Sequence, residues 1–285
     1  MKHYGVIGHP VAHSLSPLMH NTAFAALGLD SIYEAYDVRF ESLRTAVQDF
    51  RQRGFAGLNV TLPHKERIIG FLDRVTAEAK AIGAVNTVAE EDGRLVGYNT
   101  DAEGFSRSIE PLRSKIAGTT VLVLGAGGAA RAVAYVLLVS YAPRQLIIAN
   151  RSLQRAEELA ARCEALGTNT SIEVAGLAGW ELRQAVETSS LIVNSTSLGM
   201  APEADRSPLM GEAPFRCDQV VVDLVYTPLE TAFLRQAAGV GARTISGLEM
   251  FLYQGARSFE LWTGQPMPME KVRPLIENEL RKQTS

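Results

Sequence analysis

The sequence predicts an α/β protein made of a doubly wound parallel sheet preceded by a separate α/β domain. Six short apolar segments recur after residue 118, and helical or loop segments separate them. The first hundred residues also alternate strand-like and helix-like runs. At about 150 residues per domain, a chain of 285 residues has the length of two domains.

In the first hundred residues, apolar runs predict three strands and a hairpin. A helix is expected over Pro17–Leu27, and the helical spacing of four apolar residues marks the next one. Asp92-Gly93 is typical of a hairpin turn. The expected strands are Tyr4–Gly8, Ile32–Val38, Ala56–Thr61, Thr87–Glu90 and Leu95–Asn99, and the four apolar helix residues are Leu43, Ala46, Val47 and Phe50.

After Gly118 the pattern becomes regular. The strands are expected in the spatial order 3-2-1-4-5-6, because right-handed crossovers between parallel strands favour that arrangement. The last forty residues read as helical, with a break at Gly264-Gln265-Pro266. The six strands are Thr120–Leu124, Gln145–Ala149, Ile172–Val174, Leu191–Asn194, Val220–Leu224 and Arg243–Ile245.

Composition argues against several classes of protein. Lys plus Arg total 28 and Asp plus Glu total 31, and the net charge of 28 − 31 = −3 provides no basic excess for nucleic acid. Residues 121–142 carry one charge, Arg131, but their central glycines favour a buried strand, turn and helix over a membrane span. Two cysteines and a start without an apolar signal segment favour the cytoplasm. We therefore expect neither nucleic acid nor a membrane as partner.

A glycine-rich turn predicts a dinucleotide site. It follows an apolar strand, opens a helix and fits the pattern G-x-G-x-x-A of a Rossmann domain. The first glycine makes the tight turn, the second lets the backbone approach the pyrophosphate, and the helix start offers free N–H groups to it. The turn consists of Gly125, Ala126, Gly127, Gly128, Ala129 and Ala130.

The end of the next strand favours NADP over NAD. An NAD enzyme usually places an acidic residue there for the ribose hydroxyls, whereas this chain has Asn150-Arg151-Ser152 with Arg155 one helical turn later. Two guanidinium groups and a hydroxyl suit a 2′-phosphate, which an acidic residue would repel. The alternative is that Arg151 and Arg155 are solvated arginines at a helix start.

Polar residues in the first domain indicate a substrate site. Ser14 and Ser16 lie near a helix N-terminus, where they could hold a carboxylate or simply cap the helix. Asn59 and Thr61 are two residues apart and share one face of a strand. Lys65 is informative because the chain has 6 lysines against 22 arginines, and lysine can exchange a proton near neutral pH. Either Asp101 pairs with Lys65 for proton transfer or it caps the following helix.

Two other chemistries find no support. The five histidines, at positions 3, 9, 13, 20 and 64, show no zinc-ligand spacing, and we expect no metal. The chain also contains no Tyr-x-x-x-Lys sequence, which counts against short-chain dehydrogenase chemistry on this fold.

These features together resemble the shikimate dehydrogenase family. The matching stretches follow the family's order and cover the chain from residue 5 to about 264. Glu249 departs from the family pattern, in which a small or uncharged residue precedes the methionine. The stretches are Gly8–Pro10, His13–Pro17, Asn59–Lys65, Gly83–Thr87, Asn99–Asp101, the glycine turn, Asn150–Ser152, Asn194–Met200, Gly247–Met250 and Gln254.

The resemblance implies reversible NADPH-dependent reduction of 3-dehydroshikimate to shikimate, a small-molecule substrate, by a monomer or homodimer. Residues 1–101 would bind substrate, 102–247 would form the Rossmann domain, and 248–285 would return as helices to the first domain. Lys65 and Asp101 would be the catalytic pair. The implied substrate contacts are Ser14, Ser16, Asn59, Thr61, Asn86, Tyr226 and Gln254. The implied NADP contacts are Gly125–Ala129, Asn150, Arg151, Ser152, Arg155, Thr196, Leu224, Gly247 and Met250.

Two alternatives remain open at this point. A quinate/shikimate dehydrogenase of the same family could use NAD, although Arg151 and Arg155 argue against it. A non-catalytic ligand sensor on a dehydrogenase-like fold could lose Lys65 or Asp101 and would be expected to carry an added partner segment. This chain keeps both residues, and we see no such segment.

Overall fold

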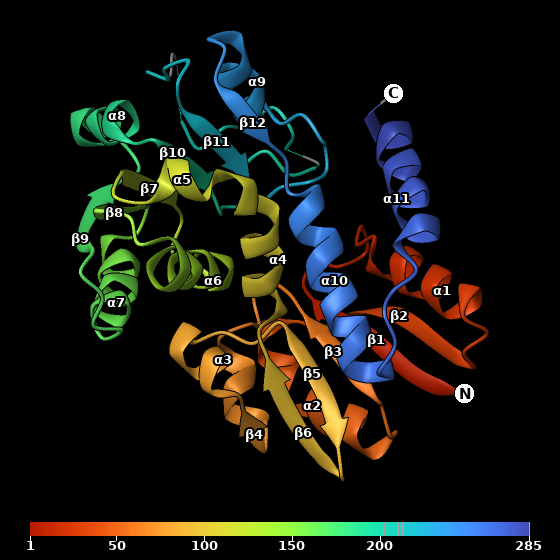
Figure 1. Cartoon of the computed structure of the whole chain (residues 1–285). Helices are drawn as coiled ribbons and strands as arrows, with labels where there is room; N and C mark the ends of the chain where they lie inside the picture. Colours follow the sequence, from red (N-terminus) through yellow and green to blue (C-terminus); the bar gives the residue numbers. More distant parts are fainter. Residues whose placement is uncertain (202, 210, 212–213, 285) are drawn as a thin grey trace. The chain divides into compact units, whose positions relative to one another are not determined.

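The computed structural model of the chain describes residues 1–201, 203–209, 211 and 214–284 (Figure 1). The chain divides into two units. Unit 1 contains Met1–Gly104 and Leu252–Lys282, so it is built from both ends of the chain. Unit 2 contains Phe105–Phe251.

Unit 1 is built on a mixed six-stranded sheet with the order β2-β1-β3-β5-β6-β4 in the described part of the chain. Strands β1, β2 and β3 are parallel, whereas β5 is antiparallel to both β3 and β6. The strands are β1 Lys2–Gly8, β2 Ser31–Asp37, β3 Gly57–Val60, β4 Arg74–Val75, β5 Thr87–Glu91 and β6 Arg94–Tyr98. The helices are α1 Ser16–Ala26, α2 Leu43–Gln52, α3 Ala77–Ile82 and α11 Met269–Thr284, with the first part of α4 Thr100–Ile109 and most of α10 Leu248–Thr263.

Helix α10 is anchored to the unit 1 sheet through Trp262. The indole Nε1 donates to the carbonyl of Val88 on β5 at 2.9 Å. A Cβ atom on Gly57 of β3 would lie 2.3 Å from that same Nε1, so only glycine leaves room for the indole ring. The C-terminal segment is therefore part of the unit 1 core.

Unit 2 contains the predicted doubly wound sheet. Its order is β12-β11-β10-β7-β8-β9, with all pairs parallel, which confirms the predicted order 3-2-1-4-5-6. Figure 1 shows α6 and α7 on one face of this sheet and α8 on the other. The strands are β7 Thr120–Leu124, β8 Gln145–Asn150, β9 Ser171–Gly176, β10 Leu191–Asn194, β11 Val220–Asp223 and β12 Arg243–Ile245. The helices are α5 Arg113–Ile116, α6 Gly128–Val136, α7 Leu153–Glu164, α8 Gly179–Thr188 and α9 Ala232–Gly239.

Residues 121–142 fold as the sequence predicts, with most of β7, a glycine turn and α6 followed by a π turn at Leu137–Tyr141. The described residues include no helix that is both long and apolar enough to cross a membrane. Short 3-10 turns occur at Phe40–Ser42, Arg67–Phe71 and Glu110–Leu112.

The predicted strands agree with the structure to within two residues at each end. Strand β4 and the short helices α3 and α5 were not predicted. Strand β4 has two residues and shows no alternation of apolar and polar side chains. Helix α3 has six residues, and it is fixed by Thr76, which accepts from the N–H of Ala79, and by Gly83, whose φ of 74° ends it.

His20 of α1 is buried in an aromatic cluster of unit 1. Its ring stacks on Tyr33 at 4.4 Å between centroids and also contacts Trp262. Neither ring nitrogen has a hydrogen-bond partner among the described residues, and burial lowers the pKa of the imidazole to about 3. The side chain is therefore neutral in the folded protein.

We expect His20 to destabilise the protein in acid. The unfolded chain takes up a proton below pH 6.5 while the folded state does not, so stability is retained above that pH and falls as the pH drops toward 3. The slope contributed by this group is about 1.4 kcal/mol per pH unit. His20→Phe should flatten the dependence of Tm on pH between 6.5 and 4. The exposed His13→Phe is the matched control, and equal slopes for wild type and His20→Phe would contradict the expectation.

Candidate active site

The strand register of unit 1 gathers four predicted polar segments at one edge of its sheet. Strands β1 and β3 are parallel, so the segments that follow Gly8 and Val60 leave from the same edge. Asn59 is the register partner of Thr87, and Thr87 is the partner of Tyr98. The start of β5 and the end of β6 therefore lie at that edge as well.

Lys65 and Asp101 form an ion pair there. Lys65 Nζ donates to Asp101 Oδ2 at 2.6 Å, and the two side chains are 18% and 6% exposed. Asp101 lies in the first turn of α4, where the positive end of the helix dipole favours a carboxylate. The pair has an ammonium group that remains partly accessible and a carboxylate that is held inside the protein.

The second carboxylate oxygen of Asp101 is held by Asn86. Asn86 Nδ2 donates to Asp101 Oδ1 at 2.9 Å and lies 3.3 Å from Gln254 Oε1. The backbone N–H of Thr100 donates to Asn86 Oδ1 at 2.6 Å, which fixes which end of the amide is the oxygen. The structure thus brings together four predicted site residues, namely Lys65, Asn86, Asp101 and Gln254.

The helix that carries Asp101 is capped by another residue. Asn99 Oδ1 accepts the N–H of Ala102 at 3.2 Å, and Asn99 Nδ2 donates to the carbonyl of Ala84 at 2.8 Å. The capping role considered for Asp101 is therefore filled by Asn99, and both carboxylate oxygens of Asp101 serve the side chains of Lys65 and Asn86.

Asn59 is enclosed by protein groups. Its Oδ1 accepts from the hydroxyl of Tyr33 at 2.7 Å, and its Nδ2 lies within 3.2 Å of Asn86 O, Thr87 Oγ1 and Ser258 Oγ. The residue is 6% exposed. Its polar atoms are thus engaged by neighbouring groups of unit 1.

The remaining predicted substrate residues lie on three segments. Ser14 Oγ accepts the N–H of Ser16 at 3.2 Å at the start of α1, where Ser16 is buried. Thr61 is half-buried directly after β3. In unit 2, the ring of Tyr226 stacks on Phe251 at 4.4 Å between centroids.

The glycine turn of unit 2 has the shape that a pyrophosphate requires. Gly125 has a φ of +110°, and a Cβ atom there would lie 2.6 Å from Ser195 Oγ. A Cβ atom on Gly127 would point into open space, and α6 begins at the next residue. The backbone N–H groups at this helix start are thus accessible to a ligand phosphate, and the residues present fit a bound dinucleotide.

The residues predicted to select NADP lie at the end of β8. Ser152 caps α7 by accepting the N–H of Arg155, and Asn150 Nδ2 donates to the carbonyl of Ser152 at 2.9 Å. Arg151 and Arg155 are both exposed. Their guanidinium groups can therefore reach a charged group at this helix start.

The other predicted cofactor residues follow neighbouring strands of the same sheet. Thr196 follows β10 and Leu224 follows β11, while Gly247 and Met250 come after β12. A Cβ atom on Gly247 would lie 2.1 Å from the carbonyl oxygen of Leu224, so this close approach requires glycine. All of these residues lie at the carboxyl edge of the sheet, where doubly wound folds bind their ligands.

The buried carboxylate of Asp223 accepts hydrogen bonds from three groups at this edge of the sheet. Asp223 accepts from Asn194 Nδ2 at 2.9 Å, from the N–H of Val225 at 3.0 Å and from the Thr231 hydroxyl at 2.6 Å. Burial raises the pKa of Asp223 to about 6, although these three hydrogen bonds oppose the shift. Asn194 Oδ1 in turn accepts from Thr196, so Asp223 supports a predicted cofactor residue indirectly.

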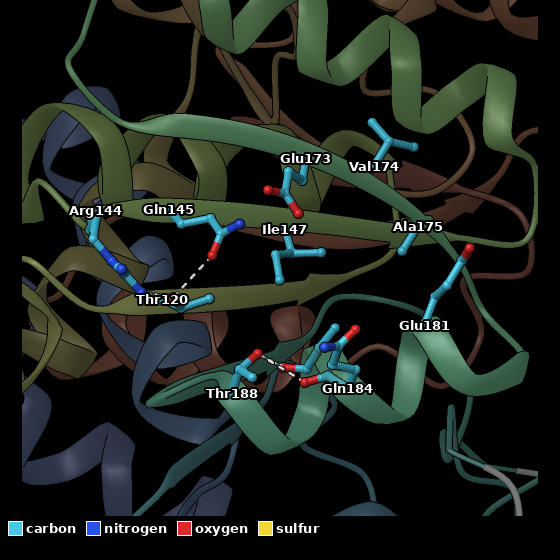
Figure 2. A pocket seen from close by; sticks show the side chains of 11 residues that line it. Thr120, Arg144, Gln145, Ile147, Glu173, Val174, Ala175, Glu181, Gln184 and Thr188 are labelled. Carbon is cyan, nitrogen blue, oxygen red and sulfur yellow. Dashed lines mark hydrogen bonds between the residues drawn. The ribbon is translucent and has the colours of Figure 1, made fainter.

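Figure 2 shows a pocket elsewhere in unit 2. It has a volume of about 470 Å³ and lies between α8 and the face formed by β7, β8 and β9. Gln145 points toward Thr120 at one end, and Glu181 lies at the other (Figure 2). None of the predicted site residues lines this pocket.

The sequence analysis gives no role to Tyr33, Thr87 and Ser258. Their hydroxyl groups make hydrogen bonds with Asn59 of the unit 1 site. Ser258 lies four residues after Gln254 on α10, a spacing that places both on one helix face. That spacing is the feature of the sequence that could have indicated a role for Ser258 near Gln254. The hydrogen bond of Tyr33 on β2 to Asn59 on β3 joins two residues that are 26 positions apart in the sequence.

Family models of three domains match the chain. Residues 6–88 match the shikimate dehydrogenase substrate binding domain, residues 108–202 match shikimate / quinate 5-dehydrogenase, and residues 247–277 match the shikimate 5'-dehydrogenase C-terminal domain.

Individual relatives agree with these models. A protein of Moorella thermoacetica named shikimate dehydrogenase (NADP(+)) is 50% identical over 93% of this chain and 88% of its own length. A crystal structure of shikimate dehydrogenase in complex with NADP⁺ is 40% identical, with a TM-score of 0.88 over 98% of this chain and 96% of that one. The Thermus thermophilus enzyme, solved with NADP(H) and shikimate, is also 40% identical, with a TM-score of 0.83 over 99% and 100% of the two chains.

Proposed function

This chain belongs to the shikimate dehydrogenase family, and on that premise we propose that Lys65 and Asp101 carry the proton in its reaction. The reaction is the reversible NADPH-dependent reduction of 3-dehydroshikimate to shikimate, a step of aromatic amino-acid biosynthesis through chorismate. The chain is an oxidoreductase, and NADP is its cofactor.

The observation that carries the proposal is the 2.6 Å contact between Lys65 Nζ and Asp101 Oδ2. When bound, NADPH supplies the hydride to the keto carbon of the substrate. Negative charge then develops on the carbonyl oxygen, and the Lys65 ammonium group stabilises that charge and donates a proton to it. In the reverse direction Lys65 takes the proton from the substrate hydroxyl. Asp101 keeps the ammonium group in place through its buried carboxylate.

The remaining polar residues of unit 1 are assigned to particular groups of the substrate. We assign Ser14 and Ser16, at the start of α1, to the substrate carboxylate, because hydroxyl groups and a helix N-terminus both favour an anion. Thr61, Asn86 and Gln254, together with Tyr226, are assigned to the ring hydroxyls. Asn59 is assigned to the ring hydroxyls as well, and its amide is also engaged by four protein groups.

The NADP contacts are assigned to the carboxyl edge of the unit 2 sheet. The glycine turn at Gly125–Ala129 accommodates the pyrophosphate, and Arg151 and Arg155 hold the 2′-phosphate with Asn150 and Ser152. Thr196, Leu224, Gly247 and Met250 are assigned to the nicotinamide end.

As the sequence predicts, we propose that residues 1–101 bind the substrate and that residues 102–247 bind NADP. Residues 248–285 would form helices that complete the first domain. Ser285 lies outside the described residues. We also propose that the protein works in the cytoplasm as a monomer or homodimer. Free Cys163 and Cys217 support a reducing compartment.

Oxidation of shikimate, followed by absorbance at 340 nm, tests this function. We expect purified protein to reduce NADP with shikimate, with a higher kcat/KM for NADP than for NAD because Arg151 and Arg155 favour the 2′-phosphate. Quinate in place of shikimate is the parallel arm for the NAD-dependent alternative. No absorbance change with shikimate and either cofactor would refute the function, and a preference for NAD would refute the cofactor assignment.

A further inference from the structure

We propose that Ser258 of α10 is a positioning residue for the Lys65–Asp101 pair. Its hydroxyl fixes the hydrogen-bond direction in a buried polar network that ends at Asp101. The inference rests on the proposed function, because it assigns Ser258 an effect on the proton-transfer step of that reaction.

Ser258 lies at the centre of a buried cluster in unit 1. It is 0% exposed, and its Oγ lies 2.8 Å from Thr87 Oγ1, 3.1 Å from Thr100 Oγ1 and 3.0 Å from Asn59 Nδ2. Its Oγ also donates to the carbonyl of Gln254, one helical turn earlier, at 3.0 Å. One hydroxyl thus links α10 to β3, β5 and the start of α4.

One arrangement of the donors in this network leads from Asn86 through Thr100 to Ser258. The Thr100 N–H can only donate, so the atom of Asn86 that it meets at 2.6 Å is Oδ1, and the Asn86 nitrogen must face the other way. That nitrogen donates to Asp101 Oδ1 and to Thr100 Oγ1, each at 2.9 Å. Thr100 Oγ1 accepts this bond and can donate its own proton to Ser258 Oγ, whose proton goes to the Gln254 carbonyl.

Loss of the Ser258 hydroxyl removes the acceptor at the end of this sequence. The Thr100 hydroxyl must then donate to Asn86 Oδ1, which is 3.2 Å away and already accepts the Thr100 N–H, or to Thr87 Oγ1 at 3.0 Å. Asn59 Nδ2 loses one of its acceptors at the same time. A buried network with an unsatisfied member adopts several arrangements, so the Asn86–Asp101 hydrogen bond is no longer held in one geometry.

Ser258→Ala tests this role with little change in volume. We expect kcat for shikimate oxidation to fall about three- to tenfold, as for the loss of about one hydrogen bond. KM for NADP should change less than twofold. KM for shikimate should also change less than twofold, because the lost contact acts on the proton-transfer step and not on binding.

Thr263→Val is the matched control. Thr263 lies on the same helix, and its Oγ1 donates to the carbonyl of Phe259 just as Ser258 donates to that of Gln254. Its loss should leave kcat and both KM values at those of the wild type. Ser258→Cys, which preserves the size of the side chain but bonds weakly, is the second test variant if Ser258→Ala does not fold, and the same result is expected of it.

The outcomes separate this inference from the function on which it rests. If the wild-type protein does not oxidise shikimate, the proposed function fails. If the wild-type protein is active and the folded Ser258 variant matches it in kcat, only the positioning role fails. A fall in kcat with a comparable rise in KM for shikimate, or an equal fall of kcat in Thr263→Val, also overturns the positioning role, because a purely structural contact would produce it.

Discussion

Replacement of Lys65 with alanine is expected to lower kcat by about 10² to 10⁴, the usual contribution of a positioned proton donor. The variant removes the ammonium group that lies 2.6 Å from Asp101 and leaves the buried carboxylate without its cationic partner. The expected loss concerns the chemical step, so KM for shikimate should change much less than kcat. Steady-state rates with shikimate and NADP measure both constants.

The exposed Lys80→Ala is the control for the Lys65 variant, since it removes the same charge from unit 1 away from the pair. It should retain wild-type kcat. If Lys65→Ala kept wild-type kcat and raised KM alone, Lys65 would bind the substrate without transferring a proton. Circular dichroism of both variants verifies that the fold is intact.

The second large effect is expected at Arg151. Arg151→Ala should lower kcat/KM for NADP by about ten- to a hundredfold, as expected for the loss of a hydrogen bond to a charged group. The value for NAD should remain close to that of the wild type, because NAD has no 2′-phosphate for the guanidinium group to hold. Parallel titrations of the two cofactors at saturating shikimate measure the ratio.

Arg183→Ala serves as the control for Arg151, because it removes an exposed arginine from α8 of the same unit. It should not change the ratio of NADP to NAD. Equal losses with the two cofactors in Arg151→Ala would mean that Arg151 acts on a part that both molecules share, and the assignment to the 2′-phosphate would be wrong.

The unit 2 sheet could be predicted from the sequence because each of its strands is marked by a pattern of neighbouring residues. Each buried strand reads as a short apolar run, and the steric preference for right-handed crossovers then determines the order of the strands. The glycine turn was predictable because its glycines stand next to one another in the sequence. The φ of Gly125 and its close approach to Ser195 explain why a residue without a side chain is needed there. Strand β4 was not predictable, because two residues cannot show a period.

The residues of the unit 1 site could be predicted from the sequence, but the hydrogen bonds that connect them could not. Lys65 and Asp101 stand out by residue type and by their place after strands. The enclosure of Asn59 depends on Tyr33 and Ser258, and Ser258 lies 199 residues from Asn59 in the sequence. No periodicity connects residues so far apart, and their contact follows only from the return of α10 to the first sheet.

The return of α10 also has a consequence for biosynthesis on the ribosome. The polypeptide emerges from its N-terminal end, so the first sheet is exposed long before Trp262 is available to fill the space above Gly57. Unit 2 is contiguous in sequence, whereas unit 1 needs residues 252–282. Vectorial synthesis therefore lets unit 2 mature first and leaves the half with the Lys65–Asp101 pair to be finished only after residues 252–282 have been made.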